Sequence, residues 1–338
     1  MLQILKNIFL VGLLGCSSTE IQRKKLEIRA PFDGDVFDNL EPFPDKSLFT
    51  VLRWRFSRMF TAPSWPDWVE TSTLRPPSSS SDLKISLINH ATILIQMDGI
   101  NILTDPIYSQ RSSVVSFAGP KRIHSPGIQF EDLPVIHAVL VSHNHYDHLD
   151  VPTLKLLQKR DQPRIFAGLG TKGFLEAEGI SGAIDLDWWE ETQLFGLSLT
   201  FVPAQHWSMR ATVDRRSMLW GGYYIKGSEN VYFAGDTGYG KFFSAIRKKL
   251  GSPDWALLPI GAYEPRWFMK HSHMNPMEAV QAGVDLGTKR AMGMHFGTFS
   301  NLADEGYLQP KRDLERALGV RGLAKDWFLY PKVGVLYP

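Results

Sequence analysis

The sequence has one cysteine, Cys16, among its 338 residues. A disulfide within the chain is therefore excluded, and so is a metal site built on several thiolates. The chain also has little net charge, because 37 lysines and arginines stand against 35 acidic residues. This balance gives no broad field of one sign, so we predict that nucleic acid is not a partner.

The first apolar run, residues 8–14, follows Lys6 and is too short to span a bilayer, but it suits the hydrophobic region of a signal peptide. Its ending, Leu-Leu-Gly-Cys, resembles the lipobox of bacterial lipoproteins, in which the cysteine becomes the lipidated first residue. We therefore expect a signal peptide over residues 1–15 and a lipid on Cys16. A chain lipidated in this way is expected in the bacterial cell envelope. Ser17, the residue after the cysteine, favours the outer membrane. The alternative is an ordinary secretory signal or a buried helix.

Residues 16–47 are polar and carry charges of both signs, which predicts a tether with little fixed structure before a domain over residues 48–338. At the start of this domain, in residues 48–60, apolar side chains recur at helical spacing and arginines occupy the flanks. This pattern predicts an amphipathic helix. It leaves two places for the helix, on a membrane surface or packed on its own domain.

Further along, short apolar runs alternate with helical patterns, and the Asp98-Gly99 dipeptide between two runs indicates a β-hairpin. Strands are expected at residues 84–88, 91–97, 100–104, 135–142, 164–167, 197–202, 218–225, 230–234, 256–260 and 290–295, and helices at residues 151–159, 240–250, 276–286 and 311–318. Many strands with inserted helices predict a single α/β domain with an N-terminal extension. Its two sheets would pack face to face between outer helices, as a four-layer αββα sandwich.

The sequence Ser-His-Asn-His-Tyr-Asp-His lies at the end of the apolar strand expected at residues 135–142. It places His143, His145, Asp147 and His148 in one short loop. Imidazole and carboxylate are the ligands that zinc, iron and manganese accept when thiolate is absent. Alternate residues at a strand end point the same way, so His143 and His145 can reach one ion. Asp147 and His148, beyond the turn, can reach a second ion. The loop therefore predicts a two-metal site, with zinc as the first choice.

Three more candidate ligands, His206, Asp236 and His295, follow predicted strands later in the chain. A single histidine at a strand end is more often structural, but together with the loop these residues complete a dinuclear site. The expected groups are His143, His145 and His206 around one ion, Asp147, His148 and His295 around the other, and Asp236 between them.

The motif His-x-His-x-Asp-His, followed in this order by the three later ligands, resembles the metallo-β-lactamase superfamily. The run Gly-Ala-Tyr-Glu-Pro-Arg-Trp-Phe-Met-Lys at residues 261–270 and the run Phe-Ala-Gly-Asp-Thr-Gly-Tyr at residues 233–239 are similar to the N-acylphosphatidylethanolamine-hydrolysing phospholipase D family. The resemblance covers residues 48–330. It implies the αββα fold, two zinc ions, a homodimer and a membrane phospholipid substrate. It also implies that His273 lies beside the metals as a catalytic or substrate-binding residue.

From this resemblance we expect a phosphodiesterase that converts N-acylphosphatidylethanolamine-like lipids to phosphatidic acid and an N-acylethanolamine. Two metal ions about 3.5–4 Å apart lower the pKa of a shared water, so that a bridging hydroxide can attack phosphorus. His273 would either protonate the leaving alkoxide or position the phosphate by a hydrogen bond. Asp147 is expected to serve catalysis as well as metal binding.

Four further residues have two interpretations each. Asp105 either supports a ligand histidine or caps a turn before a proline. His90 either lines the substrate pocket beside the metals or is structural. Tyr263 and Arg266 either shape the substrate-binding rim, with Arg266 on phosphate, or belong to a stretch with a folding role, in which Glu264 and Arg266 form ion pairs.

Two alternative functions use the same residues. A lactonase acting on a sugar lactone or an acyl-homoserine lactone would share the metal site. Lipid hydrolysis, in contrast, needs an apolar groove beside the metals, and the helix at residues 48–60 is expected to form its wall. The other alternative is a metal-binding lipoprotein without turnover, against which the complete ligand set argues.

Overall fold

A computed structural model of the protein describes residues 28–338. The expected signal peptide and Cys16 lie outside the described residues. Within the described part, no helix is both long and apolar enough to cross a membrane.

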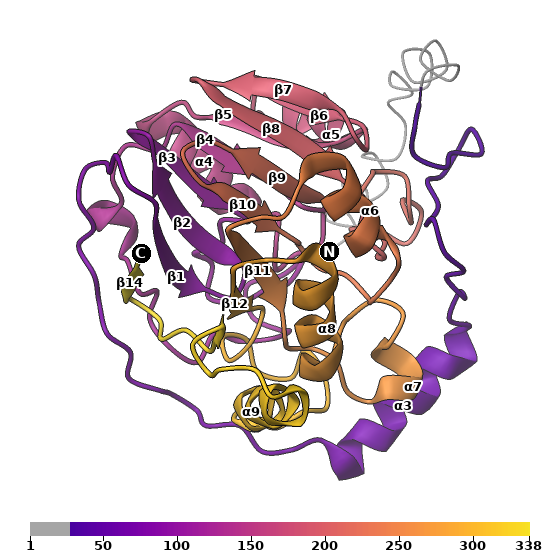
Figure 1. The fold of residues 1–338 in the computed structure, drawn as a ribbon. Helices are drawn as coiled ribbons and strands as arrows, with labels where there is room; N and C mark the ends of the chain where they lie inside the picture. Colours follow the sequence, from indigo (N-terminus) through magenta and orange to yellow (C-terminus); the bar gives the residue numbers. More distant parts are fainter. Residues whose placement is uncertain (1–27) are drawn as a thin grey trace.

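Two seven-stranded sheets form the centre of the described residues (Figure 1). In the first sheet the strands lie in the order β14 (Leu336–Tyr337), β1 (Lys84–Asn89), β2 (Thr92–Met97), β3 (Ile100–Thr104), β4 (Ala138–Leu140), β5 (Arg164–Gly168) and β6 (Ala183–Leu186). In the second sheet the order is β13 (Phe328–Leu329), β12 (Arg290–Met294), β11 (Trp255–Pro259), β10 (Asn230–Phe233), β9 (Gly222–Lys226), β8 (Leu197–Val202) and β7 (Glu191–Leu194).

Helices cover the outer faces of both sheets (Figure 1). On the first sheet these are α4 (Val151–Arg160) and α5 (Thr171–Ala177), and on the second they are α6 (Phe242–Leu250), α8 (Pro276–Leu286) and α9 (Gln309–Arg321). The remaining helices are α3 (Leu48–Thr61) and the short α7 (Arg266–Met269), which lie together at the periphery, and the 3-10 turn η1 (Phe130–Asp132).

The buried apolar side chains form two main layers. One layer fills the space between the sheets, where Ile93 and Ile95 of β2 share a cluster with Leu199 of β8, and it continues under α8. The other layer lies between the first sheet and its helices, where Val139 of β4 meets Leu154 of α4. The order helix, sheet, sheet, helix confirms the predicted αββα sandwich.

Local sequence signals explain the best-predicted elements. Asp98 and Gly99 both have positive φ, 53° and 78°, which is the conformation that a tight turn between β2 and β3 requires. At the start of α8, Asn275 accepts from the backbone N–H of Glu278 while the Glu278 side chain accepts from Asn275 N–H, which is a capping box. This cap fixes the chain two residues after His273, so it also positions part of the site.

Several boundaries differ from the sequence-based expectation. Of residues 135–142 only Ala138–Leu140 form a strand, because the polar end of this run turns into the metal loop, and β9 starts at Gly222 rather than at residue 218. Short elements such as β6, β7 and α5 were not predicted, since four to seven residues give too little periodicity. Trp267 of α7, although a large aromatic residue, is 50% exposed.

The predicted helix at residues 48–60 is confirmed as α3, and one face of it packs on the domain. Trp54 stacks on Phe268 of α7 with ring centroids 4.5 Å apart and donates a hydrogen bond from Nε1 to Asp304 at 3.0 Å. Arg58 forms an ion pair of 2.8 Å with the same carboxylate. These contacts attach α3 to the segment that leads toward His273.

Residues 28–47, which we expected to form part of a loose tether, are instead packed on the domain. Phe37 is 1% exposed and its backbone N–H donates to the carbonyl of Arg216. Asn39 is also buried. The polar composition misled the prediction because this segment is stabilised by hydrogen bonds to distant residues, which local sequence does not reveal. We call residues 28–47 the strap.

Candidate metal centre

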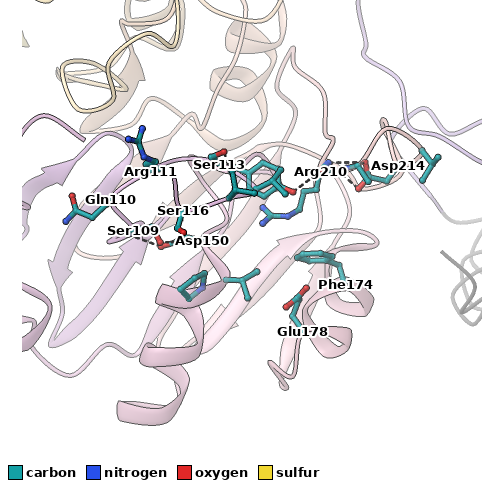
Figure 2. A pocket seen from close by; sticks show the side chains of 17 residues that line it. Ser109, Gln110, Arg111, Ser113, Ser116, Asp150, Phe174, Glu178, Arg210 and Asp214 are labelled. Carbon is teal, nitrogen blue, oxygen red and sulfur yellow. Dashed lines mark hydrogen bonds between the residues drawn. The ribbon is translucent and has the colours of Figure 1, made fainter. Parts of the chain in front are cut away.

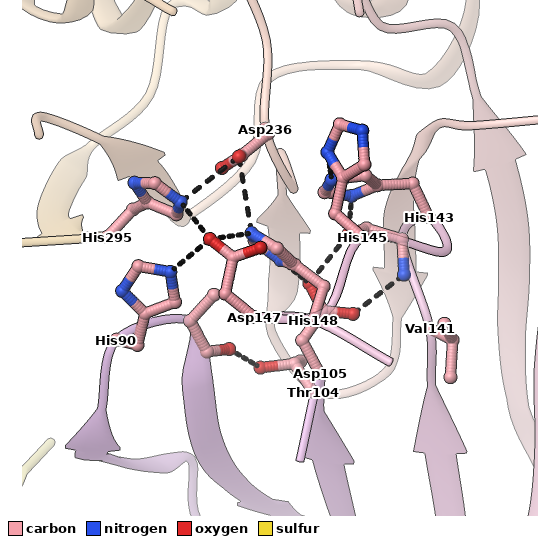
Figure 3. Close-up of polar contacts among 12 residues, drawn as sticks. His90, Thr104, Asp105, Val141, His143, His145, Asp147, His148, Asp236 and His295 are labelled. Carbon is pink, nitrogen blue, oxygen red and sulfur yellow. Dashed lines mark hydrogen bonds and ion pairs between the residues drawn. The ribbon is translucent and has the colours of Figure 1, made fainter. Parts of the chain in front are cut away.

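The candidate ligands lie at one edge of the sandwich, each shortly after the end of a strand. The loop with His143 to His148 follows β4, and it is closed by hydrogen bonds from the N–H groups of His148 and Leu149 to the carbonyl of His145. His206 follows β8, and Asp236 and His295 come directly after β10 and β12. Because strands of both sheets end here, their polar ends converge (Figure 3).

The structure brings all seven predicted ligands together. Their donor atoms fall into overlapping groups within 4.8 Å of one another: His143, His145 and His206; His90, Asp147, His148 and His295; His143, His148 and Asp236; and His206, Asp236 and His273. Two of these groups contain the two predicted ligand triads. Asp236 links them, because its Oδ2 lies 3.2 Å from His148 Nε2 and 3.0 Å from His295 Nε2.

The donor atoms fit metal ions because several of them make no hydrogen bond and face only other candidate ligands. Among the described residues, His145 Nε2, His148 Nε2, His295 Nε2 and Asp236 Oδ1 are buried without a hydrogen bond. An unmade hydrogen bond of a buried polar atom costs about 1–3 kcal/mol, so converging atoms of this kind indicate ligands. Burial also lowers the pKa of His143 well below its usual range, which keeps the ring neutral and its lone pair available.

Asp105 supports the metal loop from beneath, which favours the first of its two interpretations. Its Oδ2 lies 2.7 Å from His148 Nδ1, and its two carboxylate oxygens accept from the N–H and the hydroxyl of Ser142 at 2.7 and 2.6 Å (Figure 3). Both Asp105 and His148 are fully buried. The carboxylate therefore fixes the ring of His148 with Nε2 directed at Asp236.

His90 belongs to the centre rather than to a substrate rim. It is 1% exposed, its Nε2 lies 3.1 Å from Asp147 Oδ2, and its ring packs on that of His295 with centroids 3.9 Å apart. The sequence left open whether His90 lines the substrate pocket beside the metals or is structural. In the structure it is a buried neighbour that orients Asp147.

Tyr263 and Arg266, expected at the substrate-binding rim, are engaged elsewhere. Tyr263 is 1% exposed and donates from its hydroxyl to Asp313 at 2.6 Å. Arg266 forms an ion pair of 2.7 Å with Glu278 and donates to the carbonyl of His273 at 2.9 Å. These contacts correspond to the folding role that was the alternative, and Arg266 thereby anchors the backbone of His273.

His273 lies beside the metals, as the resemblance implied. Its Nδ1 is 3.8 Å from Asp236 Oδ2, and its ring centroid is 5.2 Å from that of His206. Burial lowers the pKa of His273 to about 3, so the ring is neutral in this environment. A neutral ring can accept or donate a hydrogen bond at the face of the centre.

The strap supplies contacts to the centre that sequence analysis missed. Asn39 accepts from the N–H of His206 at 2.9 Å and donates to its carbonyl at 2.8 Å, so it holds the ligand's backbone on both sides. Gln205 donates to the carbonyl of Glu41 at 3.2 Å. No local signal in the sequence pairs residues that lie more than 160 positions apart.

Replacing Asn39 by alanine should weaken the site without removing a ligand. The N–H and carbonyl of His206 would lose their partners, which costs about 1–3 kcal/mol for each buried group. We expect metal affinity to fall about 10- to 100-fold, because residues that orient ligands have effects of this size. Metal content after dialysis against a competing chelator measures the change. Asp35→Ala, on the exposed side of the strap, is the control, and equal losses in both variants would contradict the prediction.

Lys46 is a second residue of the strap that the sequence analysis did not single out. Its Nζ lies 4.2 Å from the centroid of the Phe268 ring, and its charge contributes to the low pKa of His273. The neighbouring Asp45 pairs with Arg215 and Arg216, not with Lys46. Burial lowers the pKa of Lys46 to about 8. Within residues 28–338, Lys46 is thus a half-buried cation that pairs with no carboxylate and whose charge acts on His273.

A cavity of about 820 Å³ lies beside the metal loop (Figure 2). Tyr146, between His145 and Asp147 in the chain, is one of its walls, and Arg210 donates to the carbonyls of Asn144 and Leu149 at both ends of the loop, 2.8 Å each. Its apolar lining residues are Val114, Val115, Val151, Pro152, Phe174, Ala211 and Val213. Helix α3, which we expected to form the wall of a groove, is not part of this lining.

Comparison with known proteins agrees with this geometry. The family described as "Beta-lactamase superfamily domain" matches residues 100–296. N-acyl-phosphatidylethanolamine-hydrolyzing phospholipase D 1 of Caenorhabditis elegans is 38% identical over 260 residues, which are 73% of each chain. A UPF0173 metal-dependent hydrolase of Methanopyrus kandleri is 31% identical over 221 residues, covering 64% of this chain and 85% of that protein.

Solved structures share the fold. Igni18, a metallo hydrolase from the archaeon Ignicoccus hospitalis, superimposes with a TM-score of 0.56 at 23% identity and covers 76% of this chain and 98% of its own. The family match, the identity to the nematode enzyme and the shared fold lead to one conclusion. The chain is a metal-dependent hydrolase that belongs to the metallo-β-lactamase superfamily, within the family of N-acylphosphatidylethanolamine-hydrolysing phospholipases D.

Proposed function

We propose that the protein is a two-zinc phosphodiesterase that hydrolyses N-acylphosphatidylethanolamine-like phospholipids to phosphatidic acid and an N-acylethanolamine. The observation that carries the proposal is the cavity of about 820 Å³ beside the metal loop, which combines an apolar lining with the cations Arg111 and Arg210. Its volume is in the range of about 300–1,000 Å³ that suits a sizeable ligand. The name of the nematode relative supports the same substrate class.

The two ligand groups would hold the ions, and bound ions would supply an activated water and polarise a phosphoryl oxygen. The chain's own residues prepare the site for this chemistry. Asp105 fixes His148, and Arg266 anchors the carbonyl of His273. The partly buried ring of His273 is placed to hydrogen-bond a substrate oxygen, either at the phosphate or at the leaving group.

Lys46 completes the binding of an anionic substrate in this proposal. A cation that pairs with no carboxylate of the described part, and whose charge acts on His273, is free to neutralise one charge of a phosphodiester. Lys46→Met should therefore raise KM for the phospholipid about tenfold and leave kcat nearly unchanged, because a hydrogen bond to a charged group contributes about 1.5–3 kcal/mol.

The same role predicts a dependence on pH. Since the pKa of Lys46 is about 8, the ammonium is charged at pH 7 and loses its proton as the pH rises through 8. KM of the unmodified protein should rise over this interval, and KM of Lys46→Met should not. Lys46→Arg should keep a low KM at pH 7 and also above pH 8. Lys311→Met, at an exposed site, is the control, and a shift of kcat rather than KM in Lys46→Met would refute the role.

The function itself is tested with purified, metal-loaded protein and a lipid labelled in its N-acyl chain. Release of labelled N-acylethanolamine together with phosphatidic acid supports the proposal. Opening of an acyl-homoserine lactone without any lipid hydrolysis would establish the lactonase instead. Absence of turnover on both substrates with metal fully bound would favour a binding lipoprotein.

The proposed place of action is the bacterial cell envelope, with the chain held there by a lipid on Cys16. The support is the sequence Leu-Leu-Gly-Cys after a short apolar run. Mass spectrometry of the N-terminal peptide tests this part separately, because an unmodified Cys16 in protein isolated from its own cell would overturn it.

A further inference from the structure

Helix α3 carries an apolar surface that the domain leaves uncovered. Ser47 caps the helix by accepting from the N–H of Thr50, and Trp54, Arg58 and Ser57 belong to its inner or partly buried side. The outer side presents large apolar residues that are 55% to 76% exposed: Leu48, Phe49, Leu52, Phe56, Met59 and Phe60. Three phenylalanines at this exposure are unfavourable in water. Full burial of each side chain would stabilise the protein by roughly 1.5–3 kcal/mol, and the exposed residues do not gain this free energy.

The positions of these side chains form a pattern. With 3.6 residues per turn, the six apolar residues fall in an arc of about 120°, opposite the side that docks on α7. Arg55 borders one edge of this arc and Arg53 the other, and both are exposed. The helix contains no acidic residue. We call these eight residues the α3 face.

We propose that the α3 face docks on an anionic phospholipid surface, with the apolar arc among the acyl chains and Arg53 and Arg55 at the level of the headgroups. This inference rests on the proposed function for its choice of lipid, and it deepens that function by naming the surface that meets the membrane. An apolar stripe bordered by cations is the arrangement expected of a helix that lies in a membrane interface.

The contacts of α3 connect this surface to the metal centre. The inner side of the helix packs on Ala262, Phe268, Met269 and Ala303, and residues 266–274 continue from there to His273 (Figure 1). Phe268 also contacts Lys46, the last-but-one residue before the helix. The α3 face is therefore linked through Phe268 to Lys46, and through residues 266–274 to His273.

A second copy of the chain is the competing occupant, and charge disfavours it. Two α3 faces in a two-fold symmetric contact would bring arginines of both copies to one interface without a carboxylate from either helix. Like charges in such a contact are destabilising. Anionic headgroups, in contrast, supply the missing negative charge on both edges of the arc.

The test uses the full chain with Cys16→Ser, so that a lipid anchor makes no contribution. Flotation with vesicles of phosphatidylethanolamine and phosphatidylglycerol is compared before and after adding Phe49→Ser, Phe56→Ser and Phe60→Ser. Binding should weaken at least about tenfold, because each buried methylene contributes about 0.8 kcal/mol. The matched control replaces two exposed apolar residues elsewhere, Phe195→Ser and Val320→Ser, and should bind as before.

A second variant tests the charges. Arg53→Gln with Arg55→Gln should reduce binding to the anionic vesicles and leave the weaker binding to pure phosphatidylcholine unchanged. Unaltered flotation of both variants would overturn the proposal. So would a dimer in sedimentation that the phenylalanine substitutions convert to a monomer while vesicle binding persists.

These vesicles contain no N-acylphosphatidylethanolamine, so docking and catalysis are read separately. Turnover of a small soluble phosphodiester, bis(p-nitrophenyl) phosphate, should be equal in the unmodified protein and in the phenylalanine variant. Vesicle binding without hydrolysis of any phosphodiester would refute the proposed function and leave the docking surface standing.

Discussion

Asp236→Ala is expected to abolish hydrolysis and to lower the metal content of the protein. Asp236 Oδ2 lies within 3.2 Å of Nε2 of both His148 and His295, so its removal separates the two ligand groups. Loss of one metal's charge stabilisation is worth several kcal/mol, and about 4 kcal/mol corresponds to roughly 10³-fold in rate. Activity and metal content, measured on the same sample, check the prediction.

The exposed carboxylate Asp82 provides the matched control, and Asp82→Ala should behave as the unmodified protein does. Removing metal from the unmodified protein with a chelator should give the same inactive state. Zinc, iron and manganese added back one at a time should restore activity to different extents and so identify the preferred ion. Retention of more than a tenth of the activity by Asp236→Ala would refute the central place of Asp236.

Asp105→Ala is expected to combine a large loss of stability with a large loss of metal. The substitution leaves the Ser142 N–H, the Ser142 hydroxyl and His148 Nδ1 without their buried acceptor. Removing one partner of a buried ionic pair costs about 3–5 kcal/mol, and freeing a ligand histidine lowers metal affinity about 10- to 100-fold. Urea unfolding of the metal-free protein and a metal titration measure the two effects independently.

Asp105→Asn separates shape from charge at the same position. The amide oxygen can still accept from His148, so the metal affinity should fall less than in Asp105→Ala. Its NH₂ group, however, would take the place of Oδ1 and face the backbone N–H of Ser142, so the protein should still be destabilised. If the asparagine and alanine variants were equally and only slightly affected, Asp105 would be a turn residue and not a support of His148.

The sequence was sufficient to predict what depends on local pattern and residue chemistry. Alternation and run length predicted most long strands, and the spacing in the loop from His143 to His148 predicted ligands that the structure brings together. His206 and His295 could be added because each follows an apolar strand and imidazole suits a metal. These inferences needed no knowledge of which strands are neighbours.

What the sequence did not reveal depends on contacts between distant residues. Asn39 and Lys46 lie in a polar segment without periodicity, and only their positions against His206 and Phe268 give them a role. The sequence left two roles open for Arg266, a contact with phosphate, which a guanidinium suits, and an ion pair within the fold. In the structure Arg266 is held by Glu278, a partner that becomes a neighbour through the cap of α8.

The strap changes where the functional unit of this chain begins. A shortened chain starting at Leu48 would keep every residue of the metal centre. It would nevertheless lose the two hydrogen bonds between Asn39 and His206 and the cation of Lys46. Tension on the N-terminal side, for example from an anchored end, would act first on residues 28–47 and through Asn39 on the backbone of His206. The strap is thus the segment through which a pull on the proposed anchor would reach the backbone of a metal ligand.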